Sequence, residues 1–531
     1  MSSGRRRLRA FKRWMASQGI ECSDAVHLTE IPHYQGGGGG GGFAVKALCS
    51  LRNGDLVARI PKLSCLTIRT SAASQLIQHA SLDGSLALAL AIMYERSLRH
   101  LSSWASYLHL LPHHESLPLV WSMDEVDSLL CGTELHKTVK EDKALIVEDW
   151  KESILPLLDS APFKLDPSFF SVEEYFAART LIASRSFEID SYHGFGMVPL
   201  ADLFNHKTGA EDVHFTSVSS QSELVDEAQS GPDNEAHCSK TIESDSAVND
   251  EPTTLIPPVD NTGSDTDVIG RNSCSDDEPE CHSVLDEGSA ALEMIMVKDV
   301  EAGNEVFNTY GSSGNAALLH RYGFTEPDNP FDIVNIDLEL VLQWSSSLFS
   351  SRYSRARLSL FRRLDYSACV SENSEYFEIS SDGEPQIELL ILLYIMLLPE
   401  DAYCKLDITV STAGNVNGSM GMLLLDKSDI LCKETSKMTQ MNKDLLLTKD
   451  VCKALLSLAD IREGLYGPNS IKDDAEALAR CCRVRERKLY HSLVLRVSER
   501  RILEKLRTYA TLGARLRNAK GCSMRKKLKR T

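Results

Sequence analysis

The sequence predicts an α+β protein in which a β-rich domain carries a helical insertion and is followed by an all-α C-terminal domain. Three observations predict this order. Short β-type runs occupy residues 43–61 and return near residues 196 and 291. Apolar residues at helical spacing fill the stretch from Ser85 to about Phe187, and they do so again beyond Pro330. At 531 residues the chain is long enough for two or three folded units.

The first 35 residues are expected to form a helical lead-in. Phe11, Trp14 and Met15 lie at near-helical spacing in an arginine-rich stretch. Because an arginine-rich start also fits a transit peptide, import into a chloroplast stays open. Seven consecutive glycines, Gly36 to Gly42, then predict a loop, since glycine loses the most backbone freedom on ordering.

The β-rich domain is expected to span residues 36–330. Its first two β-type runs, residues 43–48 and 55–60, are predicted to pair as a hairpin through the turn at Asn53-Gly54. Residues 85–187 form the predicted helical insertion. The all-α domain is expected over residues 331–515, and residues 516–531 form a short basic tail, interpreted as a solvated terminus.

The acidity of the chain is concentrated in one segment. Residues 216–289 contain 18 Asp and Glu against Lys240 and Arg271, and so carry −16 of the formal net charge of −18. This stretch is nearly free of aromatics, so it cannot bury enough apolar surface to offset its ordering entropy. We predict a disordered insertion in a loop between two strands of one domain. The nearly neutral remainder gives no strong attraction for phosphates, and no direct nucleic-acid partner is expected.

The spacing of the cysteines and the length of the apolar runs indicate in which cellular compartment the protein is expected. The 14 cysteines show no CxxC spacing, and the chain lacks a secretory signal, which predicts a reducing compartment, either nucleus or cytoplasm. The same spacing predicts no zinc or other metal site. The longest apolar runs, such as residues 389–398, fall short of the roughly 18 residues that a membrane span needs. No membrane crossing is expected.

Familiar catalytic motifs do not occur in the sequence. It contains no GxxxxGK[ST], no GxSxG and no HExxH, which argues against P-loop, serine-hydrolase and zinc-protease chemistry. Three unusual segments remain at predicted strand or turn positions. They are Gly42-Phe43-Ala44, then Ser184 to Phe187 leading to Asp202 to His206, and Asn308 to Gly311 continuing to Arg321 to Phe324.

The second and third segments resemble the Asn-His and Tyr-Gly motifs of SET-domain methyltransferases, in particular the Rubisco large-subunit lysine methyltransferase-like branch. That branch typically reads SR.F, then P.AD..NH, then Y....N..LL..YGF, and this sequence carries SRSF, PLADLFNH and YGSSGNAALLHRYGF. The resemblance extends through Pro61, the series from Trp104 to Thr133 and the C-terminal helices, and is nearest to the plant SET domain group proteins. It implies a SET domain followed by a helical substrate-binding domain.

The resemblance implies S-adenosyl-L-methionine as the cofactor. Gly42-Phe43-Ala44 would form the turn in which bare backbone approaches this ligand. Ala44 stands where the usual GxG has its second glycine, so the register of the turn stays open. Asn205 and His206 would hold the cofactor by side-chain and main-chain hydrogen bonds. Arg185 would contact its carboxylate, for which a guanidinium is suited.

The resemblance also implies a channel for the acceptor lysine. A lysine ammonium, with an ordinary pKa of about 10.4, has no lone pair and must lose its proton. An apolar channel lined by tyrosines disfavours the charged form, and a tyrosine hydroxyl can orient the amine. Tyr310 would be this catalytic tyrosine and would also contact the cofactor, while Phe187 and Tyr322 would wall the channel. Asp202 is expected to have a hydrogen-bonding role at a strand end.

The predicted function is that of an S-adenosylmethionine-dependent protein-lysine N-methyltransferase acting on a soluble non-histone protein. The helical C-terminal domain would present the protein substrate, and a monomer is expected. One alternative is a histidine methyltransferase of the same fold, against which Tyr322 argues because the histidine-methylating relative lacks that tyrosine. Another is a catalytically inactive SET-like adaptor, against which the intact Asn205, His206 and Tyr310 argue.

Overall fold

The N-terminal residues form a helix and two strands. A computed structural model of the protein describes residues 3–31, 42–159, 164–217, 291–364, 376–412 and 443–528. The expected helix is present as α1 (Ser3–Ser17), with Phe11 fully buried and Trp14 Nε1 donating to Ser103 O at 2.8 Å. The lead-in is not only helical, because β1 (Glu21–Cys22) and β2 (Val26–Ile31) follow. The first 35 residues therefore already contribute strands.

The predicted hairpin of residues 43–48 and 55–60 is wrong. β3 (Gly42–Ala47) pairs antiparallel with β2, whereas β4 (Leu56–Pro61) pairs with β1 and with β9 (Ala291–Met296). The turn at Asn53-Gly54 does form, with Gly54 at φ +91°. Its backbone is satisfied by a distant segment, since Gly54 N donates to Met296 O at 2.8 Å. The turn residues therefore predicted where the chain bends, but not which strands pair with β4.

The acidic insertion joins two paired strands, as predicted. β8 (Val213–Ser217) lies antiparallel to β9, with Ser217 opposite Leu292, in a sheet ordered β1-β4-β9-β8. The predicted start of the disordered insertion is wrong by two residues, because Thr216 and Ser217 belong to β8. Residues 218–290 lie outside the described residues, so their disorder stays a prediction. Residues 36–41 of the glycine run also lie outside, while Gly42 opens β3 instead of belonging to a loop.

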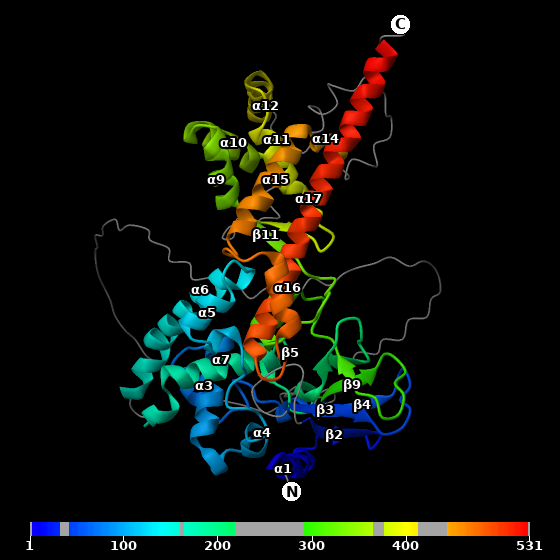
Figure 1. Cartoon of the computed structure of the whole chain (residues 1–531). Coiled ribbons are helices and arrows are strands. Elements are labelled where there is room, and N and C mark those ends of the chain that lie inside the picture. Colours follow the sequence, from blue (N-terminus) through cyan, green and yellow to red (C-terminus); the bar gives the residue numbers. More distant parts are fainter. Residues whose placement is uncertain are drawn as a thin grey trace, which may run out of the picture. The chain divides into compact units, whose positions relative to one another are not determined.

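The predicted helical insertion is confirmed, and two of its helices are largely buried. Its helices are α2 (Ser74–His79), α3 (Gly84–Ser97), α4 (Ala105–Leu108), α5 (Met123–Leu129), α6 (Glu134–Asp149) and α7 (Val172–Arg185). α3 is buried from Ala87 to Met93, and it packs against α7 (Figure 1). The side chain of Ser171 caps α7 by accepting a bond from Glu174 N. This capped helix ends at Arg185, the first charged residue of the predicted site.

Short strands and one helix carry the remaining motif residues. Strand structure returns directly after α7, earlier than expected, so Phe187 lies on a strand. The elements are β5 (Ser186–Asp190), β6 (Gly194–Met197), β7 (Asn205–His206), β10 (Phe307–Asn308) and α8 (Asn315–Tyr322). Gly323 ends α8 in the left-handed conformation at φ +74°, which glycine adopts without strain.

The C-terminal region is helical, as expected, but it is not all-α. Its helices are α9 (Leu338–Leu348), α10 (Ser351–Arg363), α11 (Ile387–Met396), α12 (Glu400–Thr412), α14 (Lys443–Leu446), α15 (Lys449–Gly464), α16 (Ile471–Arg480) and α17 (Arg487–Leu528). β11 (Val334–Asp337) and β12 (Tyr376–Ile379) pair antiparallel. The expected tail of residues 516–531 is helical as far as Leu528. None of the helices in the described ranges is long and apolar enough to cross a membrane.

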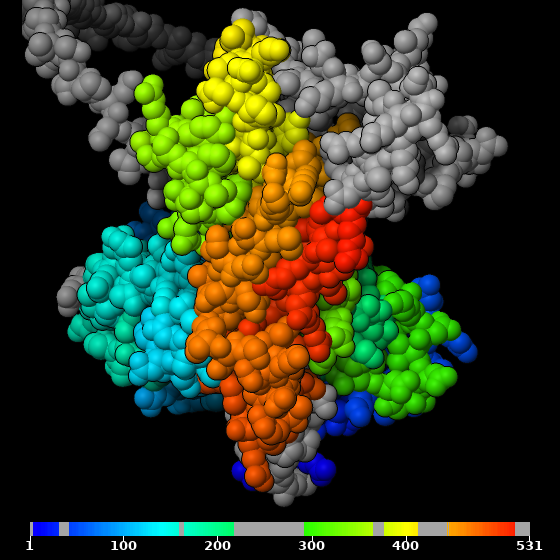
Figure 2. All heavy atoms as spheres, turned by 45° about the horizontal axis from the view of Figure 1, so that its top comes forward, coloured from blue at the N-terminus to red at the C-terminus, as the bar shows by residue number. Residues whose placement is uncertain are grey.

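Buried charges join the C-terminal helices to the helical insertion. Figure 2 shows the surface of α15 to α17 directly against that of α5 and α6. Arg462 of α15 donates to Gly132 O at 2.5 Å and to Glu134 Oε1 at 2.9 Å, and Glu499 of α17 accepts from Glu134 N at 3.1 Å. A β-carbon added at Gly132 would lie 2.6 Å from the backbone of Leu465. The two regions therefore touch through backbone as well as side chains.

Candidate active site

The structure brings the three segments singled out in the sequence to one place. β7 and β10 pair in parallel, with Asn205 opposite Phe307 and His206 opposite Asn308. β3 reaches the same point, because Asn205 Nδ2 donates to Phe43 O at 3.2 Å. Residues more than a hundred positions apart in the sequence therefore share one backbone framework, and that framework holds the Asn-His and Tyr-Gly segments together.

The Asn205 side chain has a fixed orientation. It is buried, and its amide nitrogen donates both to Phe43 O and to Glu305 Oε1, the latter at 2.7 Å. Because both acceptors bind Nδ2, the carbonyl oxygen Oδ1 must face the other way. The amide thus presents one acceptor outward from the framework. Glu305 was not predicted from the sequence, where it is one of several acidic residues before a strand.

The His206 ring stabilises Tyr310. Its Nδ1 accepts from Tyr310 N at 3.0 Å, and its Nε2 lies 3.2 Å from Thr208 Oγ1. Burial lowers the pKa of His206, although Glu326 opposes this shift, so the ring is neutral near pH 7 and carries its proton on Nε2. Both ring nitrogens are engaged within the protein. The contact expected between His206 and the cofactor stays a prediction, and because the ring nitrogens have partners, the main chain of His206 is the part left to make it.

Tyr310 and Tyr322 form a close aromatic pair. Their ring centroids lie 4.4 Å apart, and the Tyr310 ring stacks on His206 at 5.0 Å. The Tyr310 hydroxyl donates to Phe204 O at 3.0 Å. Burial raises the pKa of both tyrosines above the ordinary value of 10, although Arg185 lowers that of Tyr310. Tyr310 is thus a neutral hydroxyl whose proton is already directed at a backbone carbonyl.

Phe187 belongs to a separate ring pair. It lies on β5, and its ring centroid is 5.0 Å from that of Phe215 on β8. Its place in a lysine channel stays a prediction. Phe215 lies at the edge of the acidic segment, and nothing in its spacing distinguished it from other strand residues.

Arg185 lies between two carboxylates instead of facing an open anion site. Its Nε donates to Glu115 Oε1 at 2.7 Å, and its Nη1 donates to Asp202 O at 3.0 Å. Asp202 Oδ2 lies 3.5 Å from the same guanidinium and accepts from Tyr107 OH at 3.0 Å. Burial raises the pKa of Asp202 to about 6, against the pull of Arg185. For Asp202 a functional role was left open and a hydrogen-bonding role at a strand end was favoured; its carboxylate accepts a hydrogen bond and also belongs to this charged cluster.

These groups fit a zwitterionic ligand. Asp202 Oδ1 is buried and has no hydrogen-bond partner among the described residues, while Asn205 offers an outward acceptor. S-Adenosylmethionine carries an ammonium, a sulfonium and a carboxylate. The buried acceptors suit the ammonium and the sulfonium, whereas the carboxylate would have to compete with Glu115 for Arg185. Glu115 and Glu305 complete the cluster, and only the tertiary fold brings them to it.

Sequence comparison finds relatives that are named lysine methyltransferases. No family model matches the sequence. Ribosomal lysine N-methyltransferase 3 of Saccharomyces cerevisiae is 27% identical over 368 residues, which cover 60% of this chain and 65% of the yeast protein, slightly less than two thirds of its length. N-lysine methyltransferase SETD6 of Bos taurus is 23% identical over 480 residues, covering 84% of this chain and 89% of the bovine protein.

Solved structures share the fold over nearly the whole chain. The SET domain of LSMT bound to lysine and AdoHcy gives a TM-score of 0.62 at 18% identity, covering 96% of this chain and 92% of that one. Rubisco LSMT bound to AdoMet gives 0.60 at 17% identity, with coverage of 97% and 93%. The fold and the paired Asn-His and Tyr-Gly segments define a SET-domain protein with a helical C-terminal region. The chain is similar to SET-domain protein lysine methyltransferases, and its fold is that of the Rubisco LSMT structures.

Proposed function

We propose that the protein transfers a methyl group from S-adenosylmethionine to the ε-amino group of a lysine in another, non-histone protein. The observation that carries this proposal is the β7–β10 pairing, which places the buried Asn205 and His206 in one cluster with the half-buried Tyr310–Tyr322 pair. The relatives named N-lysine methyltransferases support the same acceptor.

The proposed roles follow from the bonds already made. Asn205 holds the cofactor through Oδ1, because Nδ2 is occupied by Phe43 O and Glu305. The main chain of Gly42 to Ala44 lies next to Asn205, because Phe43 O accepts the hydrogen bond from Asn205 Nδ2. When bound, S-adenosylmethionine supplies a sulfonium methyl group that a neutral amine can attack.

Tyr310 positions the acceptor amine in this proposal. Its hydroxyl proton points at Phe204 O, so the oxygen presents its lone pairs to an amine N–H, which orients the nitrogen lone pair. Since burial raises the pKa of Tyr310, the phenolate is not accessible near neutral pH and this residue is not the base. The lysine instead loses its proton to solvent, favoured by the desolvating rings of Tyr310 and Tyr322.

The helical C-terminal region presents the protein substrate in this proposal. Arg462 and Glu499 join its helices to the insertion that carries Arg185, so a protein held there is fixed relative to the cluster. This part of the proposal rests on the fold and on those buried contacts.

Calorimetric titration with S-adenosylmethionine tests the proposal. We expect the native chain to bind, Asn205→Ala to lose binding, and Tyr310→Phe to keep it while losing transfer of labelled methyl groups to proteins of a cell extract. Tyr353→Phe is a matched control, because the Tyr353 hydroxyl also donates to a backbone carbonyl, Met396 O, at 3.2 Å within the C-terminal helices.

The outcomes separate the alternatives. Amino-acid analysis of the labelled proteins should give methyl-lysine, whereas methyl-histidine would assign the other acceptor. Absence of cofactor binding to the folded native chain would contradict the enzyme and favour the adaptor.

A further inference from the structure

The segment that follows the second tyrosine of the site is bonded to α17, the last helix of the C-terminal region. Residues 323–325 come directly after Tyr322, whose ring centroid lies 4.4 Å from that of Tyr310. Phe324 continues the same aromatic cluster, with its ring centroid 6.1 Å from that of His206. The position of this backbone therefore determines where two rings of the proposed site lie.

His491 of α17 is the buried partner of this segment. Its Nδ1 accepts from Thr325 N at 3.0 Å and lies 2.9 Å from Thr325 Oγ1, and both residues are buried. Burial lowers the pKa of His491 to about 3, and the charges of Arg487 and Arg483 act in the same direction. The ring is therefore neutral near pH 7, and Nδ1 keeps the lone pair that accepts this bond. Since a buried N–H without an acceptor is costly, the bond fixes the backbone of Thr325.

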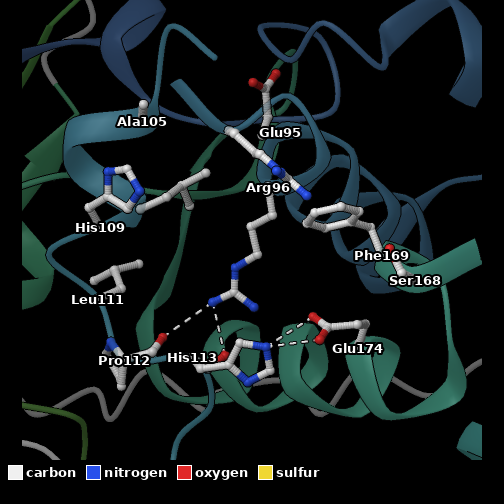
Figure 3. A pocket seen from close by; sticks show the side chains of 12 residues that line it. Glu95, Arg96, Ala105, His109, Leu111, Pro112, His113, Ser168, Phe169 and Glu174 are labelled. Carbon is white, nitrogen blue, oxygen red and sulfur yellow. Dashed lines mark hydrogen bonds and ion pairs between the residues drawn. The ribbon is translucent and has the colours of Figure 1, made fainter. Parts of the chain in front are cut away.

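The same segment also contacts the helical insertion. A β-carbon added at Gly323 would lie 3.0 Å from Ser116 O. The residues just before Ser116 are themselves held, because Arg96 donates to Pro112 O at 3.2 Å and to His113 O at 2.9 Å (Figure 3). The turn at Gly323 therefore contacts fixed backbone of the insertion, while the residues after it are bonded to α17.

Further bonds hold the two ends of the segment independently of His491. Asn315 Oδ1 accepts from Glu326 N at 2.7 Å, and Asn315 Nδ2 donates to Glu326 O at 2.9 Å. Arg487 Nη2 donates to Gly323 O at 3.3 Å. Loss of the His491 bond should therefore loosen the segment without unfolding it.

We propose that His491 is a positioning residue for methyl transfer, which holds the ring of Tyr322 against Tyr310 through the backbone of Thr325. This role rests on the proposed function, because Tyr310 and Tyr322 are the rings proposed to surround the acceptor amine. It makes α17 part of the structure that shapes the site, in addition to the presentation of the substrate.

Transfer of labelled methyl groups to proteins of a cell extract tests the proposal in two variants of the full chain. In His491→Leu the acceptor is lost, so the rate at saturating S-adenosylmethionine should fall about tenfold, because a displaced ring no longer orients the amine. The Kd of S-adenosylmethionine, measured by calorimetry, should stay within twofold. His491→Asn should restore most of the rate, because its Oδ1 branches from the same side-chain carbon as Nδ1 and can accept from Thr325 N.

Leu503→Ala is the control for lowered stability. Leu503 lies on the same helix, fully buried in the core of the C-terminal helices, and its truncation leaves a cavity there. This variant should lower the midpoint of urea unfolding at least as far as His491→Leu and should keep the native rate. The proposal is overturned if Leu503→Ala loses the rate equally, or if His491→Asn is as slow as His491→Leu.

Hydrogen exchange makes the test independent of catalysis. Mass spectrometry of peptides covering residues 322–326 should show faster amide exchange in His491→Leu than in the native chain, and His491→Asn should slow it again. Unchanged exchange in His491→Leu overturns the proposal. A native chain that binds the cofactor but labels no protein would instead contradict the proposed function, and the exchange would still decide whether His491 holds the segment.

Discussion

Glu305 should control cofactor affinity through Asn205. In the native structure its Oε1 accepts from Asn205 Nδ2 at 2.7 Å, while Phe43 O accepts from the same nitrogen at 3.2 Å. Glu305→Ala removes the shorter, charge-assisted bond and leaves the amide held by one longer bond. Such bonds contribute about 1.5–3 kcal/mol, and the half-buried position of Glu305 favours the lower end. We therefore expect S-adenosylmethionine to bind about tenfold more weakly.

The assay is calorimetric titration of three variants beside the native chain. Glu305→Gln should restore most of the affinity, because its side-chain carbonyl can accept the same bond. Glu301→Ala changes an exposed acidic residue of the same loop and should have no effect. A folded Glu305→Ala protein that binds the cofactor within twofold of the native Kd would refute the reasoning, because the amide would then be oriented without Glu305.

Two further predictions concern stability. Gly132→Ala should lower the free energy of unfolding by about 3 kcal/mol, because φ is +77° and the new β-carbon would meet the Leu465 backbone at 2.6 Å. Gly467→Ala has a similar φ of +88° with no atom within 4 Å, so in urea unfolding it should cost only about 1 kcal/mol; equal losses would contradict the steric argument. The pKa of Asp202 is raised to about 6 in the folded state. Between pH 4 and 6 the folded chain therefore keeps a proton that the unfolded chain has lost. As the pH rises through this range, the free energy of unfolding falls, and this group contributes up to about 3 kcal/mol of that fall. Asp202→Asn should flatten that fall in urea unfolding across this range, and an unchanged slope would show that Asp202 is not its source.

The motif segments could be predicted from the sequence because each is short and unusual in composition. Their meeting at one site was implied only by the resemblance to SET-domain proteins. The partner of β4 could not be predicted, because the Asn53-Gly54 turn defines only a local change of direction. β4 pairs with β1 and with β9. β9 lies beyond the acidic insertion, and local patterns do not report pairing between segments so far apart in the sequence.

The supporting carboxylates could not be predicted for a different reason. Glu115 and Glu305 are ordinary acidic residues in the sequence, and only the tertiary fold places them beside Arg185 and Asn205. The strands β11 and β12 could not be predicted either, because four-residue strands beside long helical runs show too little periodicity to be detected.

The charge balance around Arg185 limits what this residue can do. Its guanidinium lies 2.7 Å from a Glu115 oxygen and 3.5 Å from an Asp202 oxygen, and above pH 6 the three side chains together carry a net negative charge. Such a cluster attracts a cation more strongly than a carboxylate. Within the proposed site it therefore suits the ammonium or sulfonium of the cofactor, or the incoming amine. Arg185 then acts mainly as the internal counter-ion that keeps two buried carboxylates compatible with folding, and a bond from it to the cofactor's carboxylate would have to form in competition with Glu115.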